Sequence, residues 1–461
     1  MTKVFIQAAL ASLLIPFCAS INAEQAAQQT ISLNDAISLA QQNDPWLHSS
    51  RLKQSAVEHK SVAAGTLADP KVSIGMMNLP TDGWDFAQEG MTQFKVGVSQ
   101  MFPRGDSLAI KSAQLKTSAK QFPLQREDRH AQLTRLISEL WLEAYLAQRT
   151  IALINQDRVL FEQMAQIAKA NYSNAIGKTR QQDVIRAQLE IIQLEDRLTV
   201  EQQKRETALE RLNEWLQLFS IDNLDNLQSL KAATPPIILP NELPKIALTY
   251  AQQLKPDAYQ RSDAVTLLLN HPALRAIDVK HQVSKKTIEL SEQQYQPQWG
   301  VNASYGYRDD MPSGSSRADL FSVGVSFDLP LFTENKQDKQ VAAAVAESEA
   351  IKTEKYLMLK QMLSALEKEL AQLTRLSERQ ALYKQQLIEQ THHQAEAALT
   401  AYTNDDGDFS DVVRARITEL NANIAALKID VDALKSVAKI NYLLTQSNHT
   451  MTEPTQQLGD Q

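Results

Sequence analysis

The residues best suited to chemistry form an acidic stretch near the C-terminal end of the chain: Asp405, Asp406 and Asp408. Carboxylates grouped this closely attract cations and repel one another when they are ionised. Asn, Asp and Gly are also common in tight turns, so turn formation alone explains the same stretch. An EF-hand calcium loop is excluded. A loop that began at Asn404 would have Phe409 where glycine is required and Ala415 where the bidentate glutamate belongs.

A second candidate group consists of His392, His393 and Glu396. On a helix, His392 and Glu396 share one face, which is a spacing that metal-binding pairs use. Because no third ligand is evident, we predict no metal site and no resident cofactor. The sequence also lacks a nucleophile elbow, a phosphate-binding loop, an HExxH motif and a dinucleotide fingerprint. It therefore predicts a protein that is not an enzyme.

The N-terminus has the pattern of a secretory signal peptide over residues 1–23. Lys3 precedes an apolar stretch, and small residues follow from Ala19 to Ala23. The only cysteine, Cys18, lies in this segment, and its lipidation is an alternative that the bulky Phe17 disfavours. Beyond residue 23 no apolar run approaches the roughly 20 residues of a membrane helix. The net charge of −7 argues against nucleic acid as a partner.

The sequence segments that must position the candidate residues occur twice, and matching residues are separated by a nearly constant number of positions. Asn43-Asp44-Pro45 recurs as Asn270-His271-Pro272, and Phe94-Lys95-Val96-Gly97-Val98-Ser99 recurs as Phe321-Ser322-Val323-Gly324-Val325-Ser326. The repeat predicts a first copy over residues 24–219 and a second over 256–446. A proline-rich connector at 220–255 joins the copies, and a polar tail covers 447–461.

Four segments alternate apolar or aromatic residues with small polar ones, at about 71–79, 94–102, 298–307 and 319–329. Each has about the length of a tilted membrane-spanning strand, 9 to 11 residues. An ordinary sheet with one face on a core fits the pattern equally well. Between the strands, turn-forming residues predict solvated loops.

The remainder of each copy is predicted to be helical. A helix precedes the strands, and a long helical hairpin follows them, over about 104–219 and about 333–445. Leu133, Ile137, Leu140 and Ala144 follow the four-three spacing of a coiled-coil seam. The predicted fold class is therefore mainly α with a small β part, in an internally duplicated chain.

Both hairpins contain the pattern Tyr-x-x-x-x-Gly followed by Asp-Val-hydrophobic-x-Ala. The first copy has Tyr172, Gly177, Asp183, Val184, Ile185 and Ala187, and the second has Tyr402, Gly407, Asp411, Val412, Val413 and Ala415. With its paired strands and duplicated hairpins, the chain resembles the TolC family of outer-membrane efflux factors from about Ser32 to about Leu444. Leu67-Ala68-Asp69-Pro70 and Asn78-Leu79-Pro80 are similar to the heavy-metal branch, the cation exporters that work with RND pumps.

The resemblance implies a homotrimer in which two strand pairs from each chain build a 12-stranded outer-membrane β-barrel, with outer-membrane lipid around it. A long periplasmic α-helical coiled-coil barrel would continue the tube. The implied partners are a periplasmic adaptor (membrane fusion) protein and an inner-membrane RND pump. The expected function is a passive export duct for heavy-metal cations. Drugs or other small organic solutes are the alternative cargo, and a periplasmic coiled-coil scaffold is the alternative class of protein.

The resemblance also places the hairpin turns at the periplasmic entrance of the duct. Three copies would bring nine carboxylates together there, and the predicted gate residues are Asp405, Asp406, Asp408, Arg180 and Lys178. The two cations would pair with the aspartates across protomers and hold the entrance shut, and a solvated helical surface is the alternative explanation for them. The predicted adaptor contacts are Gly177, Asp183, Val184, Gly407, Asp411 and Val412. Local structure is the competing explanation for these residues, with Gly ending one helix and Asp beginning the next.

Overall fold

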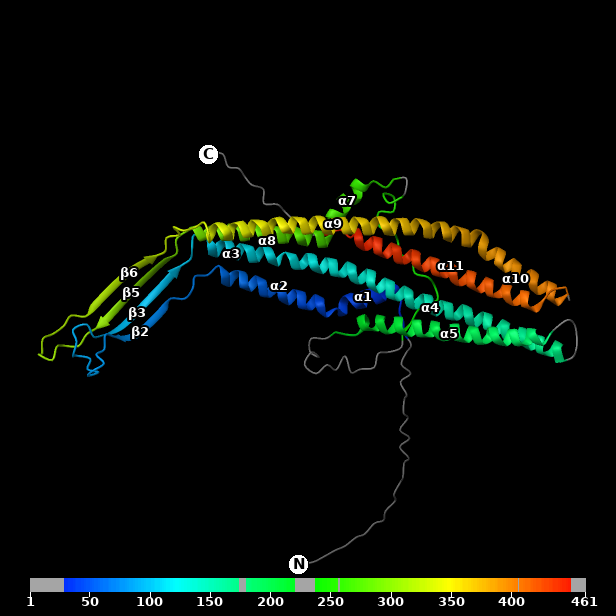
Figure 1. Ribbon diagram of the computed structural model, residues 1–461, viewed down its shortest axis with the longest axis horizontal. Coiled ribbons are helices and arrows are strands. Elements are labelled where there is room, and N and C mark those ends of the chain that lie inside the picture. Colours follow the sequence, from blue (N-terminus) through cyan, green and yellow to red (C-terminus); the bar gives the residue numbers. More distant parts are fainter. Residues whose placement is uncertain (1–28, 174–179, 220–236, 256–257, 405, 449–461) are drawn as a thin grey trace, which may run out of the picture.

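The computed structural model describes residues 29–173, 180–219, 237–255, 258–404 and 406–448. The predicted signal peptide, residues 220–236 of the connector and residues 449–461 of the tail lie outside this part of the chain. The molecule is elongated, with a small sheet at one end and the turns of long helical hairpins at the other (Figure 1). The predicted fold class is confirmed: long helices dominate, and the sheet is small.

The same order of elements occurs twice. The first copy contains α1 (Leu33–Asn43), α2 (Pro45–Ala64), β2 (Lys71–Met77), β3 (Gln93–Phe102), α3 (Ser107–Ala119), α4 (Gln121–Ser173) and α5 (Gln181–Leu216). The second contains α7 (Arg261–Leu269), α8 (Pro272–Glu292), the 3₁₀ turn η2 (Gln293–Tyr295), β5 (Trp299–Tyr307), β6 (Leu320–Phe327), α9 (Gln337–Leu382), the π-helical turn η3 (Tyr383–Leu387), α10 (Ile388–Thr403) and α11 (Phe409–Leu443). A short parallel pair, β1 (Gln29–Thr30) and β4 (Ile237–Ile238), ties the start of the first copy to the connector.

The sheet is antiparallel, with strand order β2-β3-β5-β6. The central pair β3–β5 joins the two copies, with Val96 opposite Tyr305. Within the described residues, β2 and β6 pair on one side only. The sheet therefore has two open edges, whose backbone groups are available to another strand.

The two faces of the sheet differ in chemistry. Val72, Ile74, Phe321 and Val323 lie on the apolar face and are exposed to solvent in the single chain. On the polar face, glycine lets the side chain of the neighbouring strand lie close to the backbone. A Cβ at Gly324 would stand 2.8 Å from Asn302 Oδ1.

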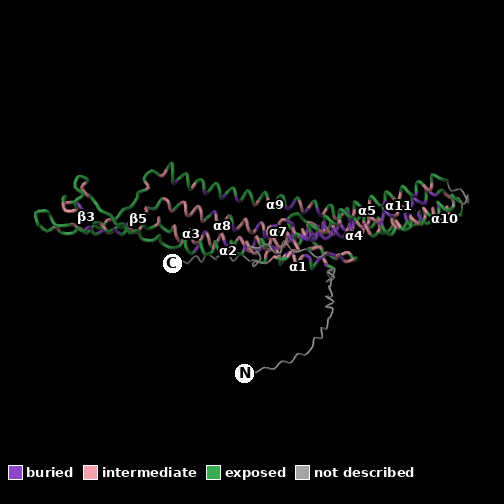
Figure 2. The backbone as a smooth tube through the Cα atoms, turned by 90° about the horizontal axis from the view of Figure 1, so that it is seen from below, coloured by how far each residue is buried: buried purple, intermediate pink, exposed green. Residues whose placement is uncertain are grey.

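The core lies along the helical arm, and the sheet has little burial of its own (Figure 2). α4 packs against α5 and α11, while α8 packs against α3 and α9. The coiled-coil seam predicted from the sequence is buried, with Leu133, Ile137, Leu140 and Ala144 all inside. Each such side chain contributes roughly 1.5–3 kcal/mol by leaving water. This packing holds the long helices together along the arm.

The first arm of the predicted hairpin at about 104–219 is divided into two helices. α3 ends at Ala119, and α4 begins at Gln121 with Pro123 in its first turn. Proline is tolerated there because it has no N–H to donate, and the first turn of a helix does not use that group. The second copy passes through its arm without such a break, but it contains the π-helical turn at Tyr383–Leu387.

The strand-to-helix junctions of the two copies are bound to each other. Arg104 forms an ion pair with Asp328 and donates to the carbonyl oxygen of Gln296 at 2.7 Å. Asp328 also accepts from the backbone N–H of Gln298 at 2.6 Å. The junctions lie where the sheet meets the helices, so these contacts set the direction in which the arm leaves the sheet.

No helix within the described ranges is both long and apolar enough to cross a membrane.

Candidate functional site

The turns of the two helical hairpins lie together at the end of the arm remote from the sheet (Figure 1). Gly177 and Lys178 of the first turn, and Asp405 of the second, lie outside the described residues. The other predicted gate and contact residues are described. Some of their side chains form contacts that stabilise the turns, and others form no such contact.

In the second turn, Gly407 serves the backbone. The turn is closed by backbone hydrogen bonds from Asn404 to Thr400 (3.1 Å) and from Asp406 to Ala401 (2.9 Å). A Cβ at position 407 would lie 3.0 Å from Ala401 Cβ and from the Tyr402 nitrogen. Glycine is therefore favoured by close approach to the end of α10. Positive φ angles among the described glycines occur at Gly105 and Gly314.

The neighbouring aspartates are not used in this way. Asp406 and Asp408 are both exposed. Asp408 occupies the N-cap position of α11, yet its side chain accepts no capping hydrogen bond from the helix. Turn chemistry would normally use that oxygen to satisfy one of the first backbone N–H groups. The carboxylate of Asp408 is instead directed to solvent, so helix capping does not account for it.

In the first turn, by contrast, an aspartate side chain does form a capping hydrogen bond. Asp183 accepts a hydrogen bond from the backbone N–H of Arg180 at 2.8 Å and thereby stabilises the start of α5. Arg180 itself is exposed. In the second copy, the equivalent Asp411 forms an ion pair of 3.3 Å with Arg414, and both side chains are exposed.

The two turns are supported by an apolar cluster formed by α4, α5 and α11. Phe409 and Val413 are buried with Ala187, and Val184 packs against them. Tyr402 meets Phe409 edge-on at 5.5 Å between ring centroids. Val412, predicted as an adaptor contact, is 0% exposed, because its position near the start of α11 directs it into the hairpin. Its side chain shapes the tip from inside and offers no surface in the single chain.

His392, His393 and Glu396 each contact a different partner. His392 Nδ1 lies 2.7 Å from Glu419 Oε1, and His393 Nε2 lies 3.5 Å from Glu389 Oε1. Glu396 is bound by Arg416 at 2.6 Å. Across the described part of the chain, no group of three or more His, Cys, Asp or Glu side chains is arranged to hold a metal ion. The His392–Glu396 pair is thus part of an ion-pair network.

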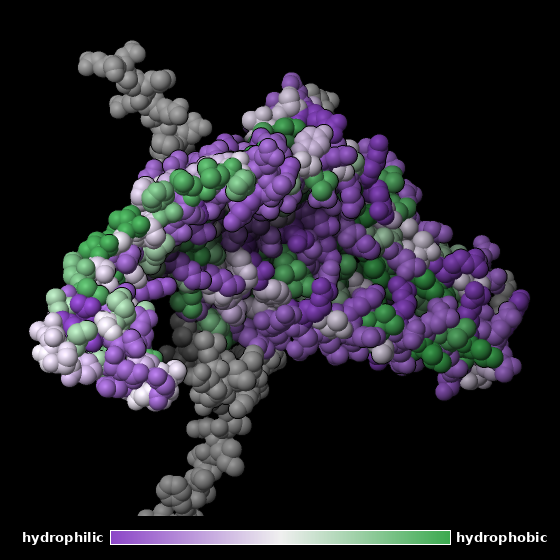
Figure 3. Space-filling view, turned by 60° about the vertical axis from the view of Figure 1, so that its left-hand side comes forward, coloured by the Kyte–Doolittle hydropathy of each residue, from purple (hydrophilic) through white to green (hydrophobic). Residues whose placement is uncertain are grey.

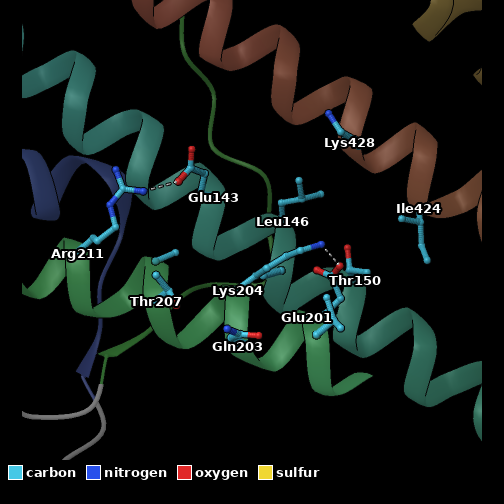
Figure 4. A pocket seen from close by; sticks show the side chains of 13 residues that line it. Glu143, Leu146, Thr150, Glu201, Gln203, Lys204, Thr207, Arg211, Ile424 and Lys428 are labelled. Carbon is cyan, nitrogen blue, oxygen red and sulfur yellow. Dashed lines mark hydrogen bonds and ion pairs between the residues drawn. The ribbon is translucent and has the colours of Figure 1, made fainter. Parts of the chain in front are cut away.

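A groove of about 660 Å³ lies along the arm between α4, α5 and α11, away from the tips (Figure 4). Arg211 is paired with Glu143 at 3.4 Å, and Lys204 with Glu201 at 2.6 Å. Because these charges already satisfy one another, they provide no ready recognition of a charged ligand. The groove is a gap between neighbouring helices rather than a formed binding site.

In the middle of the arm, the two copies differ in the residue that caps a helix. Asp44 caps α2 by accepting from the Trp46 N–H (3.0 Å), and it also binds Arg129 at 2.7 Å. Its counterpart His271 caps α8 by accepting from the Ala273 N–H through Nδ1 (3.2 Å). Its Nε2 lies 3.1 Å from the Tyr442 carbonyl oxygen. Nε2 therefore carries the proton and donates, and the ring is neutral.

Burial sets the protonation of the groups around this second cap. Desolvation lowers the pKa of His271, and it raises the pKa of Asp128, which lies near His271 and accepts from the Tyr442 hydroxyl at 3.1 Å. Both shifts favour neutral side chains. Sequence reasoning missed this group. The aligned positions Asp44 and His271 were its only signal, because the repeat replaces a charged cap with a neutral one.

An open sheet with a polar and an apolar face, continuous with a long duplicated helical hairpin, is a fold that this chain shares with outer-membrane efflux channels. Residues 264–445, nearly all of the second copy, match the family described as outer membrane efflux protein. No curated protein sequence matches the chain.

Solved structures of low sequence identity share the fold. The channel CusC is 12% identical with a TM-score of 0.68, over 90% of this chain and 92% of that one. The outer membrane protein VceC of Vibrio cholerae is 14% identical with a TM-score of 0.68, over 90% and 96%. A membrane protein from Pseudomonas aeruginosa is 14% identical with a TM-score of 0.72, over 90% of each chain.

Proposed function

We propose that this protein is the outer-membrane channel component of a tripartite efflux system, a passive duct that continues through the periplasm. The observation that carries the proposal is the four-stranded sheet, which has one polar face, one exposed apolar face and two open edges. Four strands do not close a barrel, for which about eight is a practical minimum. An open edge in lipid leaves backbone groups unsatisfied at several kcal/mol each.

A homotrimer solves this problem. Three copies supply twelve strands, with β2 of one chain meeting β6 of the next. The helical arm supports the same assembly, because α5 carries exposed apolar residues at coiled-coil spacing: Ile185 (57% exposed), Leu189 (49%) and Ile192 (61%). Such a seam is stable in water only when another helix covers it. In the proposed trimer, the neighbouring chain provides that helix.

The apolar face of the sheet is proposed to meet outer-membrane lipid. Hydrophobic residues gather along the outer edge of the sheet and again near the hairpin end, while much of the remaining helical surface is hydrophilic (Figure 3). The exposed strand residues include Ile74, Phe321 and Val323, which would be costly to leave in water. The polar face, with Asn302 and its glycine neighbours, would line the aqueous lumen.

At the other end, the hairpin turns are proposed to form the periplasmic entrance. Asp405, Asp406 and Asp408 would act as gate residues together with Arg180 and Lys178. The exposed, uncapped carboxylate of Asp408 supports this role. A ring of such groups raises the local concentration of cations.

The partners in this proposal are a periplasmic adaptor protein and an inner-membrane RND pump, which supplies the energy. Docking would use the surface around the turns, at Gly177, Asp183, Val184, Gly407 and Asp411, with Val412 beneath it. Of the described members, Asp411 is the most exposed in the single chain, and Val412 supports the tip from within. We favour heavy-metal cations as cargo. The segments Leu67–Pro70 and Asn78–Pro80 and the acidic turn support this choice, and small organic solutes such as drugs are the alternative.

Cell fractionation tests the proposal against a periplasmic coiled-coil scaffold, in which the sheet would be soluble. We expect the full-length protein in the outer-membrane fraction, released only by detergent and trimeric after extraction. Recovery in the soluble periplasm without detergent would overturn the duct. Export of several metals and several drugs, measured in a deletion strain and its complemented parent, then decides the cargo.

A further inference from the structure

A group of ionisable side chains lies along α11, where this helix packs against α4 on one side and α10 on the other, above the turns. Asp157 stands on α4 between Ile154 and Phe161, both of which are buried in the apolar cluster that supports the tips. These residues lie three before and four after Asp157, so its carboxyl shares their buried side of α4. An aspartate therefore occupies a seam position where an apolar side chain is expected.

The facing helix has a charged residue in the same kind of position. Arg416 lies on α11 between Val413 and Leu420, which are both buried. Its guanidinium is bound by Glu419 at 2.9 Å and by Glu396 of α10 at 2.6 Å. Glu419 in turn contacts His392 Nδ1 at 2.7 Å. The side chains of Arg416 and Glu419 are only 15% and 17% exposed, so their ion pair is partly shielded from water and salt, whereas Glu396 and His392 are 50% and 54% exposed.

Asp157 faces this network without being satisfied by it. Among the described residues, it takes part in no hydrogen bond or ion pair, and the charges that act on it are Glu419 and Arg416 of α11. Its neighbour Arg158 is turned to Glu162 at 2.8 Å and toward Glu195 of α5. When Asp157 is ionised, a half-buried carboxylate opposes the carboxylate of Glu419, and repulsion acts across the α4–α11 contact.

We propose that Asp157, with Arg416, Glu419, Glu396 and His392, forms a proton-dependent latch that holds the second helical hairpin on the first. The latch is tight when Asp157 is protonated and loosens when it ionises. It rests on the proposed function only for its consequence: α11 leads directly to the gate turn, so the entrance opens less readily in acid.

The direction follows from the protonation of Asp157. Burial, followed by the repulsion from Glu419, raises the pKa of Asp157 from 3.8 to about 6. A group whose pKa is raised by folding stabilises the packed state when protonated. This stabilisation is complete below about pH 4 and is lost as the pH rises through 6. One pKa unit corresponds to a tenfold factor, and the partial exposure of Asp157 reduces the effect, so we expect about tenfold in total.

Hydrogen exchange of the full-length protein in detergent tests the latch. Protection factors of the amides around Phe161 and Leu420, corrected for intrinsic exchange rates, are compared at pH 5.0 and 7.5. We expect about tenfold higher protection at pH 5.0 in the wild type. In Asp157→Asn we expect high protection at both pH values. The matched control Glu162→Gln, on the same helix but paired with Arg158, keeps the wild-type difference.

Equal protection of the wild type at the two pH values would overturn the latch, as would an unchanged pH difference in Asp157→Asn. If that variant does not fold, Glu419→Gln decides. Removing the repelling carboxylate moves the midpoint of the transition to lower pH, and an unchanged midpoint contradicts the proposal. These readouts concern helix packing alone. Failure of the latch therefore leaves the export duct standing, and a soluble location of the protein leaves the latch standing.

Discussion

Among the residues of the hairpin turns, the useful distinction is whether the local fold already uses a side chain. Gly407 is favoured by the close approach of α10, and Asp183 caps the first turn of α5. Both were candidates for adaptor contact from the sequence, and both have a structural role that explains their residue type. Asp408 is different, because its carboxylate makes no capping hydrogen bond although it stands at the cap position. This argues for a role beyond turn formation.

For the gate, we predict that replacing Asp405, Asp406 and Asp408 together with asparagine lowers cation selectivity in planar lipid bilayers. Asparagine keeps the turn propensity and removes the charge. Loss of nine carboxylates from a trimer removes a local negative potential, so the ratio of potassium to chloride permeability should fall about two- to fivefold.

The matched control for the gate is Asp432→Asn. Asp432 pairs with Lys428 in the middle of α11, away from the turns. The Asp432→Asn variant should retain wild-type cation selectivity. If the triple variant also retains wild-type selectivity, the aspartates are turn residues only, and the entrance is selective by some other means.

For the helices and strands, the hydrophobic pattern predicted the most and local backbone geometry the least. The four-three spacing around Ile137 and Leu140 correctly predicted a buried seam, because burial follows the helical period. The break at Lys120 and the π-helical turn at Tyr383–Leu387 were not predicted. Both are local adjustments of a helix to its neighbours, and a single sequence contains no direct record of those neighbours.

A test at the level of the helices concerns the exposed seam of α5. We predict that Ile192→Glu prevents the trimer from forming, because a charge would enter an apolar helix–helix contact that is worth roughly 1.5–3 kcal/mol for each buried side chain. The measurement is the molar mass of the detergent-extracted protein by light scattering after size-exclusion chromatography.

The control for this test is Gln193→Glu, which adds the same charge at an adjacent exposed position off the seam. It should remain trimeric. A trimeric Ile192→Glu protein would show that α5 does not contribute its apolar stripe to the subunit contact, and the proposed arrangement of neighbouring arms would have to be abandoned.

Over the whole molecule, the sequence duplication predicted the fold but not the differences between the two copies. Two equal copies predicted the two strand pairs and the two hairpins, which the structure contains. The copies differ in their helix caps and at their strand-to-helix junctions. Asp44 is a charged cap and His271 a neutral one, and Arg104 of one junction binds Asp328 of the other. The burial of Val412 and the charges that face Asp157 depend on which helices lie side by side, so the sequence pattern did not reveal them.

The duct and the scaffold make opposite predictions for the two faces of the sheet, which cysteine labelling can distinguish. Asn302 lies on the polar face of β5 and Val301 on the apolar face, and both are exposed in the single chain. Cys18 is the only natural cysteine, and the predicted signal peptide contains it, so background labelling is small. In lipid vesicles, a charged membrane-impermeant thiol reagent should modify Asn302→Cys at least about tenfold faster than Val301→Cys. The reason is that lipid excludes water from the apolar face.

Modification of Asn302→Cys should also reduce single-channel conductance by narrowing the lumen, whereas Val301→Cys serves as the control with unchanged conductance. Equal labelling rates for the two variants would mean that both faces of the sheet meet water, which a barrel wall does not allow and a soluble scaffold does.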